Sequence, residues 1–249
     1  MVPTAMRLFH LVLICSLFAA AAARGEPPAL LAEAVRKSSV DAERWAYTQT
    51  VVSRDRQGRV EEEIVVRYDP SQPYDVQWTP IKIDGKDPTD RQIEKKRKEH
   101  AKRLKERRAL GELLDLEKAV VIEETATTIT YEVPLQKNDN QRLPPDKFRV
   151  TARVGKEQQA FENVAVRLRE AMRMALIVKL KSGEADLDFT TIDPKYAPQI
   201  TGLHADGEGS ILFVRVGGNY TSTRTDFKRV KPYSERFSVK LPPMQFLDY

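Results

Sequence analysis

Hydrophobic and polar residues alternate with a period of two along much of the second half of the chain. Val164, Val166 and Leu168 share one face of a segment, and Arg167 and Arg169 occupy the other. Side chains along a strand point alternately to opposite faces of the sheet, so this pattern predicts strands with one apolar and one polar face. No helical pattern separates these segments, which favours one large antiparallel sheet with a single apolar face.

Strand-like segments of this kind continue toward the C-terminus, separated by Gly, Pro and Asp. In residues 172–183 the alternation places Met172, Met174 and Leu180 on an apolar face, opposite Lys179. The predicted segments are residues 147–155, 163–170, 172–183, 184–193, 209–218, 219–231 and 235–242. A large curved sheet of such strands, covered by few helices, leaves a groove lined by apolar side chains.

The first half of the chain mixes helix and strand signals. Leu30, Leu31, Ala34 and Val35 recur at helical spacing, which predicts a short amphipathic helix within residues 27–45. The further predicted strands are residues 45–53 and 60–68, paired as a hairpin around Gln57-Gly58, followed by residues 76–85, 119–124 and 127–134.

A strongly basic segment at residues 88–112 predicts a long helix inserted between strands. Thr89 and Gln92 have the spacing of a capping box at its start, and Gly111 is its expected end. The formal net charge of the chain is only +5, so the basic excess is concentrated in this segment.

Three interpretations of the basic segment remain open. It is a solvated lid or insertion helix, a docking surface for anionic membrane lipid or an acidic partner, or a nucleic-acid site. The stretch has no aromatic side chain on which bases could stack, so we expect no nucleic-acid partner. The candidate docking residues are Lys95, Lys96, Arg97, Lys98, Lys102 and Arg103.

The N-terminal residues have the pattern of a cleavable signal peptide. Arg7 precedes an apolar run of about 16 residues that ends in small residues at Ala21–Ala23. A membrane span needs roughly 20 apolar residues, so a retained anchor is the alternative. The single cysteine, Cys15, lies in this run, and the mature chain would fold without disulfides. We expect a signal peptide at 1–23, export to the periplasm, and one domain at 24–249.

No motif in the chain carries recognisable catalytic or metal-binding chemistry. His100 lies in the basic segment, and His204 opens a polar stretch that reads as a loop before a strand. Asp186 and Asp188 flank Leu187, an arrangement typical of two solvent-facing acids on one strand. A metal site near His204 and acid–base chemistry by the two aspartates are the alternatives to these interpretations. We expect no enzymatic activity, no catalytic residue, no metal and no cofactor.

Aromatic and methionine side chains on the predicted strands are the candidates for ligand contacts. They either fill the core or line an apolar groove that accepts a lipid chain, and the sequence pattern does not separate the two. Methionine suits adaptable contacts in such a groove. The candidate groove residues are Trp45, Tyr47, Tyr68, Trp78, Met172, Met174, Phe189 and Phe213.

Several segments taken together resemble a known family. They are "WAYTQTVV", "VVRYDPSQP", "WTPIKIDGKDPTDRQIEK" and the closing "KRVKPYSERFSVKLPPMQFLDY". Their order, spanning nearly all of the predicted mature chain, resembles the outer-membrane lipoprotein-sorting carriers, the LolA/LolB-like superfamily. Within it the chain is most similar to a group of uncharacterised bacterial secreted proteins. The resemblance implies a mainly β (α+β) fold, with a large curved antiparallel sheet, an unclosed half-barrel, covered by a few helices.

The same resemblance implies a periplasmic binding protein whose apolar cavity accepts an acyl chain, a lipid or a lipoprotein. Relatives of the carriers also act as sensor domains, so a non-catalytic envelope domain that binds a protein partner remains the alternative. The functional arginine and the lid residues of the carriers have no matching motif here, and none is transferred. The long basic helix also departs from the compact carriers.

Overall fold

The computed structural model describes residues 26–105, 109–137, 144–174, 178–211 and 214–237 of the chain. The predicted signal peptide, residues 1–23, lies outside the described residues. The strands are β1 (Trp45–Asp55), β2 (Val60–Tyr68), β3 (Trp78–Ile83), β4 (Val120–Glu124), β5 (Thr128–Glu132), β6 (Phe148–Gly155), β7 (Ala160–Leu168), β8 (Met172–Met174), β9 (Val178–Thr190), β10 (Gln199–Ile211) and β11 (Val214–Arg229). The helices are α2 (Ala29–Ser39), α3 (Asp90–Lys105) and α4 (Leu110–Leu113), with the short 3-10 helices η2 (Ala42–Arg44), η3 (Leu116–Lys118), η4 (Pro145–Lys147) and η5 (Tyr233–Arg236).

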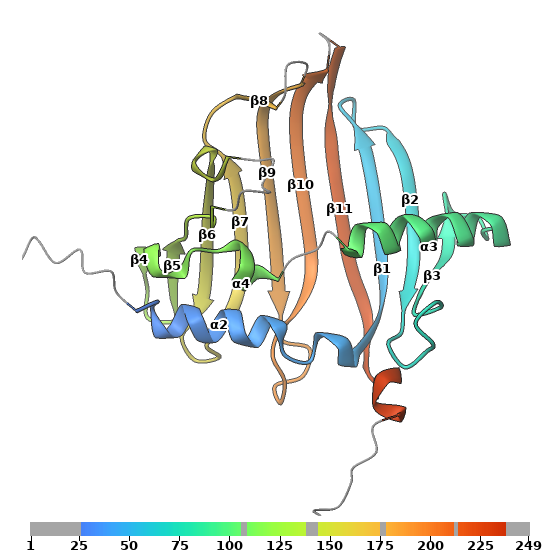
Figure 1. Ribbon diagram of the computed structural model, residues 1–249, viewed down its shortest axis with the longest axis horizontal. Coiled ribbons are helices and arrows are strands. Elements are labelled where there is room, and N and C mark those ends of the chain that lie inside the picture. Colours follow the sequence, from blue (N-terminus) through green and yellow to red (C-terminus); the bar gives the residue numbers. More distant parts are fainter. Residues whose placement is uncertain (1–25, 106–108, 138–143, 175–177, 212–213, 238–249) are drawn as a thin grey trace, which may run out of the picture.

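These strands form one antiparallel sheet of eleven strands in the described part of the chain. The strand order is β3-β2-β1-β11-β10-β9-β7-β6-β5-β4, and β8 pairs with β9. Since β3 and β4 stand at opposite ends of this order, the sheet is not closed. Helices α2, α3 and α4 lie on the same side of it (Figure 1). The predicted class, a mainly β unclosed half-barrel with a few covering helices including one long basic helix, is confirmed.

Helix α2 covers the half of the apolar face that β5, β6 and β7 provide. Leu31 and Ala34 of the helix are fully buried, at the spacing that the sequence predicted for its apolar face. They meet apolar side chains that alternate along the three strands. These are Tyr131, Val150, Ala152, Val154, Phe161 and Val164, all within 3% exposure. This cluster is the main core, and it holds α2 against one end of the sheet.

Helix α3 covers the other end of the same face. Its start has the expected capping box, because the Gln92 amide oxygen accepts from the Thr89 backbone N–H at 2.9 Å and Thr89 Oγ1 accepts from the Gln92 N–H at 3.4 Å. A smaller cluster of Ile64, Val66 and Ile83 lies on β2 and β3 beneath it. The two helices therefore cap two separate clusters on one continuous sheet.

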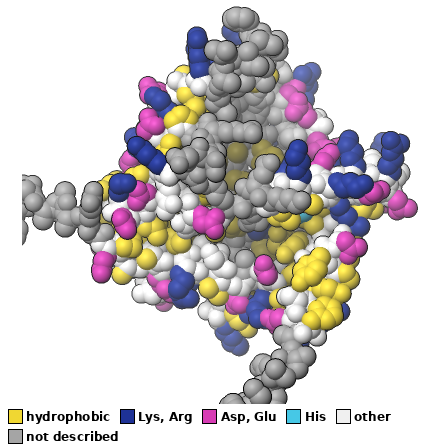
Figure 2. Space-filling view, in the orientation of Figure 1, with side chains coloured by type: hydrophobic (Ala, Val, Ile, Leu, Met, Phe, Trp, Pro, Cys, Tyr) yellow, Lys and Arg dark blue, Asp and Glu magenta, His cyan; other side chains and the backbone are white. Residues whose placement is uncertain are grey.

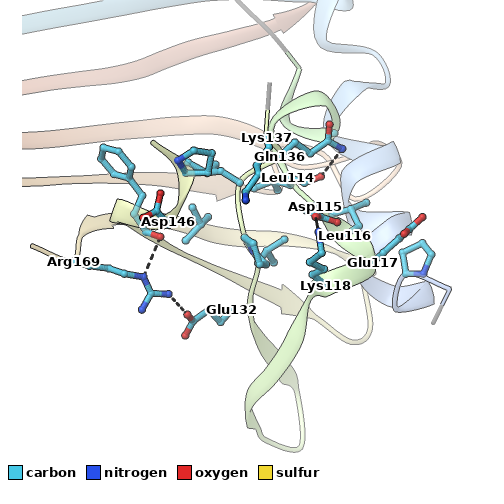
Figure 3. Close-up of a pocket in the computed structure, with 18 residues that line it drawn as sticks. Leu114, Asp115, Leu116, Glu117, Lys118, Glu132, Gln136, Lys137, Asp146 and Arg169 are labelled. Atoms are coloured by element: carbon cyan, nitrogen blue, oxygen red, sulfur yellow. Dashed lines mark hydrogen bonds and ion pairs between the residues drawn. The ribbon is translucent and has the colours of Figure 1, made fainter. Parts of the chain in front are cut away.

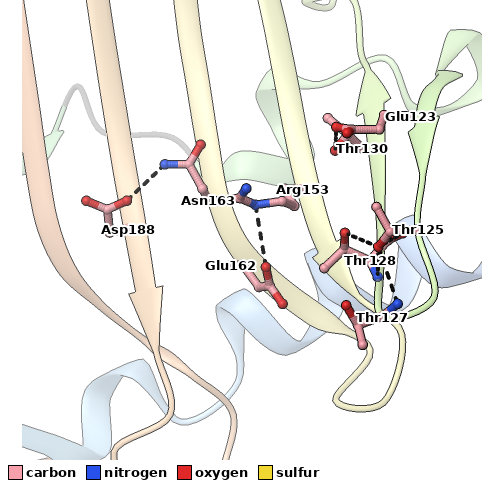
Figure 4. Close-up of polar contacts among 9 residues, drawn as sticks. All are labelled: Glu123, Thr125, Thr127, Thr128, Thr130, Arg153, Glu162, Asn163 and Asp188. Carbon is pink, nitrogen blue, oxygen red and sulfur yellow. Dashed lines mark hydrogen bonds and ion pairs between the residues drawn. The ribbon is translucent and has the colours of Figure 1, made fainter.

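The opposite face of the sheet is polar. Asn163 donates to Asp188 across β7 and β9 at 2.9 Å, and Arg153 meets Glu162 at 3.4 Å (Figure 4). Asp186 and Asp188 lie on this face, as the outward acids that their spacing predicted. The polar side chains of this face pair with one another and with solvent. Only the apolar face therefore needs helices to cover it.

Three details of the predicted strands are wrong. Residues 172–183 do not form one strand, because β8 folds back on β9 with Met172 opposite Leu180. The polar stretch from His204 to Ser210 is not a loop but the second half of β10. The predicted boundary between the segments 209–218 and 219–231 does not exist, because Gly217 and Gly218 lie within β11, where a Cβ on Gly218 would lie 2.0 Å from the Arg54 carbonyl oxygen. Close backbone approach, not a turn, requires glycine there.

The basic helix is also shorter than predicted. It ends at Lys105 within the described residues, and Ala109 has extended backbone angles (φ −69°, ψ 153°). Residues 110–113 form the separate helix α4. Gly111 therefore lies inside α4 and does not end the basic helix.

Replacing Leu31 with Ala should destabilise the chain by about 2–5 kcal/mol, because the side chain is fully buried between α2 and the sheet and would leave a cavity. Val40, just after the same helix and 39% exposed, provides the control, since Val40→Ala should change stability by less than about 0.5 kcal/mol. Urea unfolding followed by circular dichroism measures both. Equal effects of the two substitutions would contradict this account of the core.

Candidate functional site

An open cleft of about 1100 Å³ lies where α4 and η3 meet the ends of β5 and β6 (Figure 3). Its apolar lining combines the buried residues Leu114, Val133 and Val150 with the half-buried Leu116 and Phe148. The remaining lining residues are Pro27, Gly111, Asp115, Glu117, Lys118, Glu132, Pro134, Leu135, Gln136, Lys137, Pro145, Asp146 and Arg169. The cleft therefore has an apolar interior and a charged rim.

Backbone hydrogen bonds hold the segment that forms one wall of the cleft. The Asp115 N–H donates to the Pro134 carbonyl at 2.8 Å, and the Gln136 N–H donates to the Leu113 carbonyl at 2.8 Å. The Gln136 side chain adds a bond to the Leu114 carbonyl at 3.1 Å. These bonds attach α4 and η3 to the segment that follows β5. This wall of the cleft is therefore fixed to the sheet.

Gly111 brings α4 close to α2. A Cβ at Gly111 would lie 3.0 Å from Val35 Cγ1, which is tighter than ordinary van der Waals contact. A larger residue would push α4 away from α2. The glycine that was expected to end the basic helix thus sets the distance between two helices beside the cleft.

Glu132 anchors the charged rim. It accepts hydrogen bonds from Arg169 and, at 2.9 Å, from Arg149. Arg169 also donates to the Phe148 carbonyl at 3.2 Å, which fixes the arginine beside the cleft. The pKa of Glu132 lies below its ordinary value of 4.5, and the hydrogen bond from Arg169 is the main cause. Partial desolvation acts in the opposite direction and raises this pKa. Glu132 is thus a carboxylate at neutral pH.

The predicted aromatic groove residues lie elsewhere. Trp45 is buried at 4% exposure and packs edge-on against Tyr196 and Phe227. The Tyr47 ring packs against the Tyr68 ring in a tilted arrangement, with the ring centroids 5.0 Å apart, and it also contacts Phe227. These side chains form a cluster at one end of β1, β2 and β11, and none of them lines the cleft.

The other predicted groove residues are dispersed. Trp78 stacks flat on His100 of α3, at 4.3 Å between ring centroids. Phe189 contacts the core residue Phe161, at 5.5 Å between centroids. Met172 is 7% exposed, on β8. Phe213 and the side chain of Met174 lie outside the described residues. The set does not come together as one lining, and a ligand role for these residues stays a prediction.

The sequence pattern did not predict the cleft. Its apolar residues Leu114, Leu116 and Leu135 come from short connections around helices and strand ends, which have neither a strand period nor a helical one. A mild signal existed in Pro134 and Pro145, which mark irregular backbone on both sides of the cleft.

The candidate docking cations of α3 divide into two groups. Lys96 pairs with Glu62, and Arg97 donates to the Trp78 carbonyl at 3.2 Å and to Thr79 Oγ1 at 2.6 Å. These two face the sheet and attach the helix to it. Lys98 is exposed and pairs with Glu94 within the helix. The remaining three, Lys95, Lys102 and Arg103, are exposed.

The described residues contain no group of three or more His, Cys, Asp or Glu side chains placed to hold a metal ion. None of the helices in this part of the chain has the length and apolar character needed to cross a membrane.

The fold and the cleft define a class: an open antiparallel half-barrel whose apolar face is capped by helices and hollowed at one end. No family model and no curated protein matches the chain. Among solved structures, it is similar to the crystal structure of a LolA superfamily protein from Nitrosomonas europaea, with a TM-score of 0.38 and 9% identity over 84% of this chain and 96% of that one. The structure of MucB in complex with MucA(peri) is matched with a TM-score of 0.19 and 7% identity, over 82% of this chain and 100% of that one. The first of these belongs to the superfamily that the sequence segments resemble.

Replacing Glu132 with Gln should reduce stability in a pH-dependent way. A carboxylate whose pKa is lowered on folding contributes stability above its ordinary, unfolded pKa of 4.5, and this contribution is lost as the pH falls through the lowered value. The difference in free energy of unfolding between the two proteins should therefore be largest at about pH 6–7 and shrink toward about pH 3. Urea unfolding at several pH values measures it.

Glu162→Gln is the matched control, because Glu162 meets one arginine, Arg153, at 3.4 Å and is more exposed. Its effect at neutral pH should be smaller. A Glu132→Gln effect that is independent of pH would mean that the ion pairs at the rim do not stabilise the fold.

Proposed function

We propose that this chain is an exported, non-catalytic binding protein that holds an acyl chain, a lipid or the lipid part of a lipoprotein in the cleft. The observation that carries the proposal is the apolar interior of the cleft, where the half-buried Leu116, Leu135 and Phe148 are open to solvent beside a charged rim. The signal-peptide pattern of residues 1–23 supports a periplasmic location.

The size of the cleft suits such a ligand. Its volume, about 1100 Å³, is slightly above the roughly 300–1,000 Å³ typical of small-molecule sites. Exposed apolar surface in a cleft is unfavourable in water, and each methylene buried there contributes about 0.8 kcal/mol. An acyl chain that contacts Leu116, Leu135 and Phe148 would bury both its own surface and that of the cleft.

The rim adds a preference for an amphiphile. Acidic and basic side chains both line the cleft: Glu132 pairs with Arg169 near Asp146 on one side, and Lys137 lies on the other side (Figure 3). These groups can hydrogen-bond a polar head group while the apolar interior holds the chain. A purely apolar ligand would use the interior alone.

Purified protein should retain an acyl-containing ligand and bind a fluorescent fatty acid. Leu116→Glu and Leu135→Glu, which place a charge in the apolar interior, should each weaken fatty-acid binding at least about 10-fold, since burying an unpaired carboxylate is costly. Lipid extraction with mass spectrometry and fluorescence titration are the measurements.

Leu104→Glu is the control, because Leu104 is 47% exposed on α3 and does not line the cleft. If binding is instead lost in Tyr47→Ala or Tyr68→Ala and kept in the cleft variants, the ligand lies at the aromatic cluster. A protein that yields no lipid, binds no fatty acid and captures an envelope protein would support the partner-binding alternative.

The outer face of α3 adds a docking function to this proposal. Lys95, Lys98 and Lys102 recur at helical spacing on the side away from Lys96 and Arg97, which contact the sheet. Each basic residue near an anionic membrane surface contributes about 1 kcal/mol of attraction. This face would bring the binding protein to the surface that supplies or receives its lipid.

Changing Lys95, Lys98 and Lys102 to Gln should therefore weaken binding to vesicles containing anionic lipid, with a larger difference at low salt. A variant with Lys179, Lys195 and Lys228 changed to Gln loses the same charge from other exposed positions and should bind nearly as well as wild type. Vesicle co-sedimentation measures both. Equal losses would indicate attraction by net charge and not by α3.

A further inference from the structure

Three aromatic rings meet at the surface of the molecule, near the end of the sheet that β3 forms. Tyr74 lies between β2 and β3, and Phe237 directly follows η5. They are the most exposed of the large apolar side chains in the described part of the chain, at 69% and 66%. The half-buried Tyr233 of η5 joins them, with its ring centroid 5.4 Å from that of Tyr74 and 5.1 Å from that of Phe237. Tyr74, Tyr233 and Phe237 are called the aromatic tip below, and Figure 2 shows hydrophobic side chains gathered over these segments.

Hydrogen bonds hold the aromatic tip in place at the surface. The Tyr233 N–H donates to the Pro70 carbonyl at 2.7 Å, which ties η5 to the loop that carries Tyr74. The Gln77 side chain donates to the Pro70 and Gln72 carbonyls at 3.3 and 3.0 Å, and so closes this loop. Exposed rings that are already fixed can bind a partner at little cost in conformational entropy.

The charges next to the aromatic tip are mixed. Arg236 lies over the Tyr233 ring, 5.6 Å from its centroid, and Lys231 is exposed just before η5. Asp75, the neighbour of Tyr74, is exposed as well. The tip therefore has only a small positive excess of its own, and strong attraction to an anionic surface must come from a neighbouring element.

That neighbour is the basic helix α3. Asp75 lines a hollow of about 400 Å³ together with Ile93, Arg97 and Lys98 of α3, so the loop that carries Tyr74 lies beside this helix. Lys98 belongs to the exposed face of α3 that is proposed to dock at anionic lipid. The aromatic tip and the basic face therefore adjoin at one end of the half-barrel (Figure 1).

We infer that the aromatic tip is a membrane-insertion surface, which enters the interface of a bilayer whose anionic head groups are held by the lysines of α3. Tyrosine combines an apolar ring with a polar hydroxyl, and such rings collect at the level of the lipid head groups. The phenyl ring of Phe237 has no polar atom and would reach the acyl boundary. The inference rests on the docking function proposed for α3 and adds to it an apolar contact.

A protein partner fits the aromatic tip less well. Stable protein interfaces cover roughly 800 Å² on each partner and involve about 20–30 residues on each side. The tip consists of three rings on two short segments. A bilayer interface needs no complementary shape, and it accepts apolar groups that protrude beside basic residues.

The two contacts differ in their response to salt, and co-sedimentation with vesicles of phosphatidylcholine and phosphatidylglycerol separates them. Wild-type protein should keep part of its binding at about 1 M salt, because charge attraction is screened and the insertion of rings is not. Changing both Tyr74 and Phe237 to Ser should remove this salt-resistant part and lower the partition coefficient at least about 10-fold.

Val120→Ser combined with Val121→Ser is the matched control. It removes two apolar side chains that are 56% and 53% exposed on β4, at the opposite end of the sheet, and should leave vesicle binding unchanged. All variants share one N-terminus, so any membrane affinity of the N-terminal residues is common to them. Thermal unfolding of each variant checks that it is folded.

Fluorescence quenching tests insertion directly. In protein bound to vesicles with brominated acyl chains, the Phe237→Trp variant should be quenched and its emission shifted to shorter wavelength. The control Val120→Trp should not respond. Wild-type protein gives the baseline from Trp45, which is buried, and Trp78, which is stacked on His100.

The outcomes separate this inference from the docking function of α3. Salt-resistant binding that survives in the double Ser variant, or a Phe237→Trp variant that is bound but not quenched, overturns the inference and leaves docking by α3 intact. Loss of binding in the double Ser variant but not on changing Lys95, Lys98 and Lys102 to Gln supports the inference and rejects docking by α3.

A wild-type chain that binds no vesicle overturns both. A double Ser variant that keeps vesicle binding but no longer captures an envelope protein assigns the aromatic tip to that protein and overturns the inference. Fatty-acid binding in the cleft is measured on the cleft variants and is independent of these results.

Discussion

The one apolar face of an open sheet is the constraint on which the rest of the structure depends. Eleven strands with one polar face can be stable in water only if the other face is covered. The chain covers it with two helices of different character. Helix α2 is held by buried apolar side chains such as Leu31, and α3 is held by polar and stacking contacts from Arg97 and His100.

This division explains the position of the cleft. The main core fills the space between α2 and β5 to β7, but the cover thins at the ends of β5 and β6, where α4 and η3 replace a full helix. Leu114 closes the core there at 2% exposure, whereas Leu116 and Phe148 are only half buried. The charged residues follow from the same geometry, because they belong to loops and strand ends at the boundary of the covered region.

Local patterns predicted the fold class and most strands, but not the places where tertiary contacts override them. The alternation from Met172 to Leu180 continues across the boundary between β8 and β9, because the two arms of that hairpin present their apolar residues on the same face. The second half of β10 lacks an apolar pattern, and its place in the sheet shows only in the fold, where Gly207 sits opposite Gly183 and Gly218 on neighbouring strands. The cleft was unpredictable for a further reason, since Leu116, Leu135 and Phe148 come from three segments that only the folded chain brings together.

The stack of Trp78 on His100 has a consequence for how the molecule opens. Helix α3 contributes no residue to the main core, and the two aromatic planes, 6° from parallel, are among its few contacts with the sheet. Regions that lack buried apolar contacts exchange their amide protons through local opening and not through global unfolding. We therefore expect α3 to detach and return as a local unit while the sheet and the α2 end stay folded.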